Sequence, residues 1–182
     1  SPLASCCGVG ITVSASNVTV QALYVTNFQN AVLLNGVMNP TINNMALVDY
    51  CVNGLLLGGN SSNIGILNTD IQRTSLLAGT IGITGVNYTD AVNGMVIDNC
   101  TITGNALQGM AFFQHTTPVD FDDIVIKNST ISNNRQKGMY FEKLSNATFD
   151  NLIMDNNGID PTYGFNNGID INLKYDSYAN IT

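Results

Sequence analysis

An internal repeat restricts the possible folds of this sequence more than any other feature. Seven times along the 182 residues, a small residue is followed by apolar residues at alternating positions. The starts are separated by 21, 23, 26, 29, 29 and 30 residues, at Gly10, Ala31, Gly54, Thr80, Gly109, Gly138 and Gly168. A period of this length indicates stacked units, each of which buries its apolar face only against its neighbours.

Between these starts, each repeat contains two short strands joined by a two-residue corner. Ile124 and Ile126 share one face of a strand, and Ser129 and Ile131 resume the same inward direction two residues later. The inward-facing positions change from even to odd residue numbers between Ile126 and Ser129. Side chains in a strand alternate between its two faces, so this change requires a bend in the backbone. Equivalent apolar positions recur along the chain in two columns: Val20, Ile42, Ile66, Ile97, Ile126, Phe149 and Ile181, and Val25, Leu47, Ile71, Ile102, Ile131 and Met154.

The second corner residue is an asparagine in five consecutive repeats, at Asn44, Asn68, Asn99, Asn128 and Asn151. Asparagine tolerates the left-handed backbone that a sharp corner needs, and its amide can bond to the equivalent residue of the next repeat. We therefore expect an asparagine ladder at a partly buried corner.

The apolar columns and the asparagine corner resemble the pectate-lyase-like family of right-handed parallel β-helices. The resemblance covers residues 9–182 at the level of coil architecture. It implies an all-β, right-handed, single-stranded parallel β-helix with three sheets and about six to seven coils, and strands such as 139–141, 147–149 and 152–154. We treat 1–182 as one domain, and expect it to be a segment of a longer protein because neither end shows a solenoid cap.

The charge of the chain excludes several kinds of partner. Six basic and thirteen acidic residues give a net charge of -7, which disfavours nucleic acid and anionic membrane surfaces. An acidic polysaccharide would also be repelled unless Ca²⁺ bridged it to the protein. No apolar run approaches the roughly 18 residues of a membrane span.

In the resembling family, the active surface is the outer face of the first strand of each coil. Here that column becomes polar only in the later coils: Thr12, Leu33, Leu56, Gly82, Ala111, Tyr140 and Asp170. The long loops 84–94, 114–123 and 155–167 are also late in the chain. We therefore expect the site there, with catalytic candidates Glu142, Asp170 and His115 and substrate-binding candidates Tyr140, Phe113, Tyr163, Asp160 and Asn172.

Paired carboxylates are the main reason to consider catalysis. Glu142 and Asp170 should lie about one coil apart on one face, and such pairs perform acid–base chemistry on glycosidic bonds. The alternative is an ordinary solvated surface. His115 is the single histidine and lies in a loop, where solvent exposure is the ordinary outcome.

The motifs of related enzymes are absent. The chain has neither the Gly-His-Gly nor the Arg-x-Lys element of polygalacturonase-like hydrolases. Asp160-Pro161 is similar to the start of the Asp-Pro-His motif of alginate epimerases, but Thr162 replaces the histidine. We expect no metal or cofactor. Asp120, Asp122 and Asp123 could gather Ca²⁺, but we interpret this segment as a solvated loop.

The four cysteines have no metal-binding spacing. Cys7 and Cys51 each precede a strand start by three residues, but they lie two coils apart, about 9.6 Å. This exceeds the roughly 7 Å reach of a disulfide. Disulfide pairing therefore stays open, including a bond from Cys6 or Cys7 to an N-terminal cap, and Cys100 is expected to be a buried free thiol.

Seven Asn-x-Ser/Thr sequons are present. Asn60 and Asn87 lie in expected loops and are candidates for glycosylation, whereas Asn99 and Asn128 belong to the ladder and should be unmodified. The alternative is that a chain rich in asparagine and threonine generates sequons incidentally.

Two classes of function follow. The first is an extracellular or cell-surface module with a structural, adhesive or carbohydrate-binding role, whose partner is a polysaccharide or neighbouring copies of a surface assembly. The outward Leu33 and Leu56 would form its assembly patch. The second is a fragment of a polysaccharide lyase, glycoside hydrolase or epimerase, which rests on fold analogy and on the polar late coils.

Overall fold

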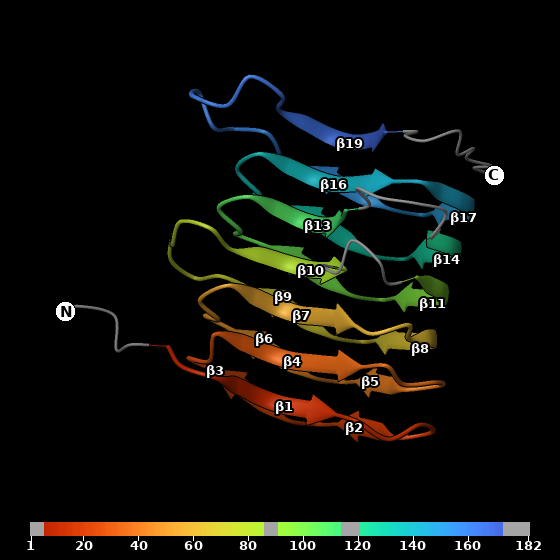
Figure 1. The fold of residues 1–182 in the computed structure, drawn as a ribbon. Coiled ribbons are helices and arrows are strands. Elements are labelled where there is room, and N and C mark those ends of the chain that lie inside the picture. Colours follow the sequence, from red (N-terminus) through yellow and green to blue (C-terminus); the bar gives the residue numbers. More distant parts are fainter. Residues whose placement is uncertain (1–5, 86–90, 114–120, 173–182) are drawn as a thin grey trace.

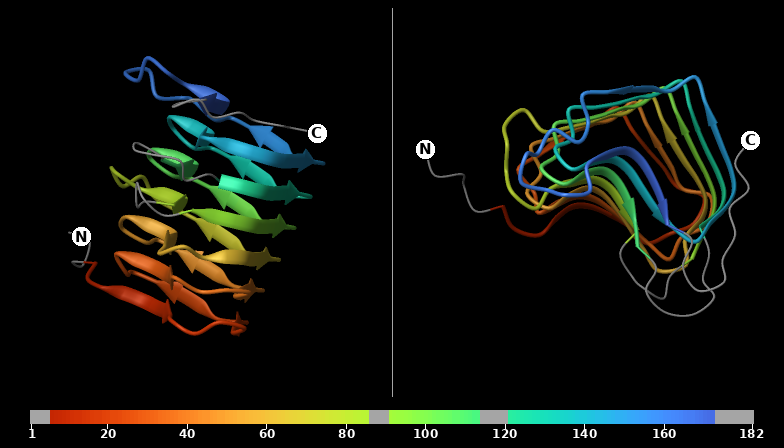
Figure 2. Two further views of the ribbon diagram at one scale, coloured as in Figure 1. Left: turned by 45° about the vertical axis from the view of Figure 1, so that its right-hand side comes forward. Right: turned by 90° about the horizontal axis from the view of Figure 1, so that it is seen from above.

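The computed structural model describes residues 6–85, 91–113 and 121–172, except for the side chain of Asn172. Every regular element in these ranges is a β-strand (Figure 1). The strands wind in stacked coils around a common axis, which confirms the predicted all-β parallel solenoid (Figure 2). Within the same ranges, no helix has the length and apolar character needed to cross a membrane.

Each coil contributes one strand to each of three parallel sheets. The first sheet contains β1 (Val9–Val13), β4 (Asn30–Asn35), β7 (Asn53–Gly58), β10 (Ile81–Gly85), β13 (Gln108–Phe112), β16 (Lys137–Glu142) and β19 (Asn167–Asn172). The second contains β2 (Thr19–Gln21), β5 (Thr41–Asn43), β8 (Ser62–Leu67), β11 (Val92–Asp98), β14 (Phe121–Lys127) and β17 (Leu144–Asp150). The third contains β3 (Tyr24–Thr26), β6 (Ala46–Val48), β9 (Asp70–Gln72), β12 (Thr101–Thr103), β15 (Thr130–Ser132) and β18 (Ile153–Asp155).

The expected number of coils, about six to seven, is slightly too high. The last described coil contributes only β19, and the second and third sheets end at β17 and β18 within the described part of the chain. The predicted strand order within a coil is confirmed, because β16, β17 and β18 contain the expected stretches 139–141, 147–149 and 152–154.

The core consists of equivalent side chains stacked from coil to coil. Ile66, Ile97 and Ile126 pair in register and are fully buried, and Phe149 continues the column while remaining partly buried. The column through Ile131 has the same arrangement. Full burial of one such side chain stabilises the fold by roughly 1.5–3 kcal/mol relative to exposure. Because the coils above and below cover these side chains, the stability of each coil depends on both neighbours. The predicted inward columns are confirmed for the described residues, and Ile181 lies outside them.

Residues with left-handed backbone recur every five positions at the corners of the second and third sheets. One coil has them at Gly94, Asn99 and Gly104, and the next coil repeats the spacing from Asp123 onward. Glycine, asparagine and aspartate tolerate this conformation better than other residues do. The sequence identified only the middle of these three columns, because the other two mix asparagine with glycine and aspartate.

The predicted asparagine ladder is present in the middle column. Asn99 Nδ2 donates to Asn68 Oδ1 at 2.8 Å, and Asn151 Nδ2 donates to Asn128 Oδ1 at 2.9 Å. At two rungs the amide instead reaches the residue before the preceding rung: Asn68 Nδ2 donates to Asn43, and Asn128 Nδ2 donates to Asp98. These rungs are exposed and not partly buried as expected, because the amides point outward from the corner.

A second asparagine ladder is buried where the third sheet turns into the first. Asn105 Nδ2 donates to Asn134 Oδ1 at 2.8 Å, and Asn134 Nδ2 donates to Asn157 Oδ1 at 2.9 Å. The buried Tyr50 hydroxyl donates to Asn105 Oδ1 and begins the ladder. Burial raises the pKa of the Tyr50 hydroxyl well above its ordinary value. This ladder satisfies polar groups that would otherwise be orphaned inside the solenoid.

A column of glycines marks the starts of the first-sheet strands because a side chain has no room there. A Cβ on Gly82 would lie 2.5 Å from the carbonyl oxygen of Gly109 and 2.6 Å from Cγ2 of Ile102. Gly82 therefore belongs to this column of glycines. The prediction that Gly82 lies on the outer face is wrong, because the register differs by two residues. Thr84 occupies the outer face instead, paired with Leu56 and Ala111.

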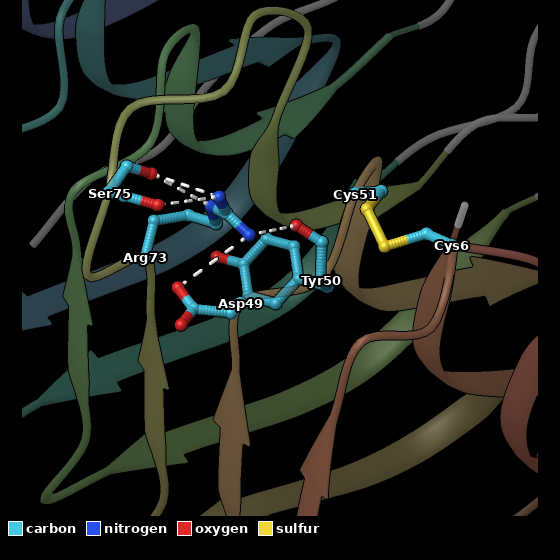
Figure 3. Close-up of a disulfide and its surroundings, with 6 residues drawn as sticks. All are labelled: Cys6, Asp49, Tyr50, Cys51, Arg73 and Ser75. Atoms are coloured by element: carbon cyan, nitrogen blue, oxygen red, sulfur yellow. Dashed lines mark hydrogen bonds and ion pairs between the residues drawn. A yellow bond between two sulfur atoms is a disulfide. The ribbon is translucent and has the colours of Figure 1, made fainter. Parts of the chain in front are cut away.

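A disulfide joins Cys6 to Cys51, with 6.0 Å between the Cα atoms (Figure 3). The sequence did not identify this pair, because the spacing estimate was made for Cys7 and assumed that the residues before β1 lie in the plane of the first coil. Cys6 instead reaches the corner that precedes β7. Cys100 is a buried free thiol as expected, and burial raises its pKa to about 11.

Arg73 occupies a third-column corner without adopting the left-handed conformation. Its guanidinium is buried and donates to the carbonyl oxygens of Tyr50 at 2.7 Å and Ser75 at 3.0 Å (Figure 3). The Asp49 carboxylate lies 3.6 Å from the same guanidinium. Arg73 therefore ties the corner of the neighbouring coil to the loop that leads into β10.

Candidate functional site

The outer face of the first sheet changes character from its early to its late coils. Tyr140 pairs with Ala111 on one side and with Asp170 on the other. The earlier members of the same column, Leu33 and Leu56, are half-buried. The predicted run of outward side chains is therefore reproduced by the register, apart from the replacement of Gly82 by Thr84.

Lys137 is a central cation of this surface and was not identified from the sequence. Its ammonium forms an ion pair with Asp170 on the adjacent strand. The same ammonium lies 4.2 Å from the centre of the Tyr140 ring and 6.0 Å from that of Tyr163. The Lys137 side chain is only 7% exposed. Its charge is therefore offset by the carboxylate and by the negative faces of the aromatic rings.

Glu142 lies two residues beyond Tyr140 on β16. Its Oε1 accepts a hydrogen bond from the Tyr140 hydroxyl at 2.5 Å, and the residue is 1% exposed. Asp170 is more accessible, with 27% of its side chain exposed. Because Glu142 pairs with Asn172 and Asp170 pairs with Tyr140, the two carboxylate residues are diagonal neighbours. Strand spacing and rise separate their Cα atoms by about 8 Å.

Aromatic side chains surround the cluster. The ring of Phe113, immediately after β13, lies 5.4 Å from the Tyr140 ring. Tyr163, in the segment before β19, lies 6.1 Å from the ring of Phe165, which is 71% exposed. Rings from three successive coils therefore converge on the outer face around Lys137.

The Asp160 carboxylate bonds to residues other than those of this cluster. Its Oδ1 accepts hydrogen bonds from the backbone and hydroxyl of Thr162, which lower the pKa of the carboxyl below its ordinary value. Arg135 lies 3.4 Å away and acts in the same direction. The side chain organises its own turn, which is the ordinary role of aspartate in such a loop.

The remaining candidates differ in how far they are described. His115, Asn87 and Asp120 lie outside the described residues, and Asn172 is placed only by its backbone pairing with Glu142. Asp122 Oδ1 accepts bonds from Ser145 and Asn146. Across 6–85, 91–113 and 121–172, no three histidine, cysteine or acidic residues gather closely enough to hold a metal ion.

Two polar residues beside the cluster also escaped the sequence analysis. Gln108 pairs with Lys137, and Thr84 pairs with Ala111. Gln108 is 7% exposed and Thr84 is 0% exposed, and Gln108 Oε1 and Thr84 Oγ1 have no hydrogen-bond partner among the described residues. Both atoms are buried, so a ligand on the outer face does not reach them in this structure. Counting the register back from Ala111 and Tyr140 would have found these two residues.

Three parallel sheets, stacked apolar columns and corner ladders define a parallel β-helix with an aromatic and charged surface on its first sheet. A family model described as a right handed beta helix region matches residues 7–179, and the chain belongs to that family. The suspected resemblance is thereby confirmed at the level of coil architecture.

Two solved structures are similar in fold. The A-module of mannuronan C-5 epimerase AlgE4 from Azotobacter vinelandii is 12% identical, with a TM-score of 0.38 over 92% of this chain and 64% of its own. The catalytic domain of a GH87 alpha-1,3-glucanase in complex with tetrasaccharides is 13% identical, with a TM-score of 0.28 over 91% of this chain and 49% of its own. This chain therefore spans less than two thirds of either protein. A search of curated proteins finds no match.

Proposed function

We propose that this β-helix is an extracellular or cell-surface module that binds a neutral polysaccharide on the outer face of β13, β16 and β19. The observation that carries the proposal is the convergence of Phe113, Tyr140 and Tyr163 around the Lys137–Asp170 ion pair. Sugar rings present apolar faces and a rim of hydroxyls, so aromatic rings beside charged hydrogen-bonding groups suit them.

The charges favour a neutral polysaccharide over an acidic one. The Lys137 ammonium is already engaged by Asp170, while the Asp170 side chain, which is 27% exposed, offers carboxylate oxygens. Hydroxyl groups can donate to these oxygens, whereas a uronate carboxylate would be repelled by the local acids and by the net charge of -7.

The disulfide supports the proposed location. A bond between Cys6 and Cys51 persists in an oxidising compartment, as secreted and surface proteins experience. The structural role and the assembly with neighbouring copies through Leu33 and Leu56 stay predictions.

Catalysis on a polysaccharide is the second candidate. Glu142 and Asp170 are carboxylate residues on adjacent strands of one sheet, the kind of pair that glycosidic acid–base chemistry uses. Two contacts favour binding instead: Asp170 is held by a cation, and Glu142 is 1% exposed and bound to Tyr140. The ion pair occupies the Asp170 carboxylate and burial removes Glu142 from solvent, whereas a general acid must reach the glycosidic oxygen.

The test is calorimetric titration of the protein with a neutral glucan and with a uronate polymer of similar length. We expect binding of the neutral polymer only. Tyr140→Ala should weaken that binding by about fivefold, since an aromatic contact is worth roughly 1 kcal/mol. Tyr24→Ala is the matched control, because Tyr24 is 68% exposed on β3 of the third sheet.

A reducing-sugar assay and an unsaturated-product assay decide between binding and catalysis. Turnover that is lost in both Glu142→Gln and Asp170→Asn would establish the enzyme reading. Binding that is equal for both polymers, or unchanged in Tyr140→Ala, would contradict the proposed surface.

A further inference from the structure

A hollow of about 440 Å³ lies on the outer face of the second sheet, away from the first-sheet surface. Its floor is formed by outward residues of β8, β11 and β14, including Gly65, Val96 and Val125. Its edge is the first left-handed column, where Asn63, Gly94 and Asp123 succeed one another. Two glycines in adjacent coils therefore remove the side chains that would otherwise fill this region.

The edge of the hollow is an interrupted asparagine ladder. Asn39 Nδ2 donates to Asn17 Oδ1 at 2.8 Å, and Asn63 Nδ2 donates to Asn39 Oδ1 at 3.1 Å. The next rung is Gly94, which has no side chain to donate to Asn63. A Cβ on Gly94 would lie 2.7 Å from Asn63 Oδ1, so this acceptor points into the place of the missing rung. We call this place the open rung.

An acceptor also borders the open rung on its other side. Asp123 is the next residue of the column, is exposed and can accept but not donate when ionised. Asn146, one coil further, donates to Asp122 and not to Asp123. Asn63 and Asp123 are two coils apart, about 9.6 Å along the axis. A group seated between them must therefore supply hydrogen-bond donors in both directions.

The surroundings of the open rung define the rest of the ligand. Asp123 is the one ionisable side chain among the described residues that line the hollow. The nearest cation on the same strand, Lys127, already lies 3.4 Å from the Asp98 carboxylate. The floor beside the rung is apolar, and Val96 is 37% exposed there. A positively charged donor group on an aliphatic stem fits both parts.

We propose that the open rung binds a primary ammonium group on an unbranched aliphatic stem. The ammonium donates to Asn63 Oδ1 and to the Asp123 carboxylate, and the stem lies on Val96 and Val125. A lysine side chain of a partner polypeptide and a free aliphatic polyamine share this chemistry. The site is independent of the polysaccharide surface, because it lies on a different sheet.

The test follows backbone amide resonances of the ¹⁵N-labelled protein during titration with two probes, spermidine and the blocked tripeptide Gly-Lys-Gly. We expect saturable shifts at Gly65, Gly94 and Val96. Shifts with the peptide alone assign the site to a partner lysine, and shifts with spermidine alone assign it to a free polyamine. Shifts caused equally by the Nε-acetylated peptide, or the absence of saturable shifts with both probes, would overturn the proposal.

Three variants locate the binding. Asp123→Asn should weaken it by at least about tenfold, because a hydrogen bond to a charged group is replaced by one to a neutral group. Gly94→Asn should abolish it, because its Cβ would lie 2.7 Å from Asn63 Oδ1 and displace that acceptor, while asparagine tolerates the φ of 75° found there. Asp150→Asn, which removes an exposed carboxylate from β17 of the same sheet, should leave affinity unchanged. Equal weakening by Asp123→Asn and Asp150→Asn would reduce the effect to net charge and reject the site.

Discussion

The two asparagine ladders allow the effect of burial on one kind of hydrogen bond to be measured within one protein. Asn134 belongs to the buried ladder and is 0% exposed. Asn68 belongs to the exposed ladder and makes bonds of nearly the same length, 2.8 and 2.9 Å. We predict that replacing Asn134 by alanine destabilises the fold far more than replacing Asn68 by glycine.

The magnitude follows from the groups that each change leaves behind. Asn134→Ala removes the acceptor of both the backbone N–H and the side-chain amide of Asn105. It also removes a donor to Asn157. Two net hydrogen bonds at about 1 kcal/mol each, and a buried N–H orphaned at about 1–3 kcal/mol, give a loss of about 4 kcal/mol.

The exposed replacement should cost much less. At Asn68, water replaces the lost amide contacts, so each bond is worth about 0.5 kcal/mol. Glycine retains the φ of 50° without strain and adds an entropic cost of about 0.5 kcal/mol. The expected loss is therefore about 1.5 kcal/mol, and the two variants should differ by roughly 2.5 kcal/mol.

Urea unfolding measures both losses. The chain has seven tyrosines and no tryptophan, so tyrosine fluorescence reports the transition, with far-ultraviolet circular dichroism as a second probe. Coincident transitions with unchanged slopes are required before free energies are compared. If Asn134→Ala costs no more than Asn68→Gly, burial does not govern the strength of these ladders and the reasoning is refuted.

Three further outcomes are expected. Cys6→Ser should lower the unfolding free energy by up to about 4 kcal/mol, because the lost bond to Cys51 closes a separation of 45 residues, and added reductant should then have no further effect. Burial raises the pKa of Cys100 to about 11, so the stability that this thiol contributes is complete below pH 9.0 and falls as pH rises toward 11, a loss that Cys100→Ala should remove from the stability–pH curve. After expression in a glycosylating secretory host, peptide mass mapping should find glycan on the exposed Asn60 and none on the ladder residue Asn128.

The fold could be predicted because its main signals are local and repeat in every coil. Ile97 and Ile126 alternate with outward residues in the same way, and stacking is the arrangement that buries such columns together. The asparagine corner was visible for the same reason. The pairing of Tyr140 with Asp170 then followed from counting, so this part of the candidate site was also within reach of the sequence.

The errors arose where the decisive contact lies between coils. Thr80-Ile81-Gly82-Ile83 fits the marker pattern as well as Gly82-Ile83-Thr84-Gly85 does. Only the approach of Gly82 to the next coil's carbonyl selects the second register. Lys137 precedes its glycine marker by one residue, so the marker pattern gives no signal for it. The Cys6–Cys51 bond depends on the path of the chain before β1, which no periodicity determines.

Residues that depart from the corner pattern can indicate positions used for something other than folding. Left-handed residues every five positions fix the corners of the second and third sheets, so most of those positions are dictated by the coil. Arg73 breaks the pattern, and its guanidinium supplies the bonds that tie the adjacent coil in place. Gly94 keeps the conformation but gives up the ladder bond to Asn63, and no described residue takes the place of its side chain. Glycine at position 94 costs the solenoid a stabilising hydrogen bond that asparagine would make. A ligand at the open rung explains this loss better than folding does.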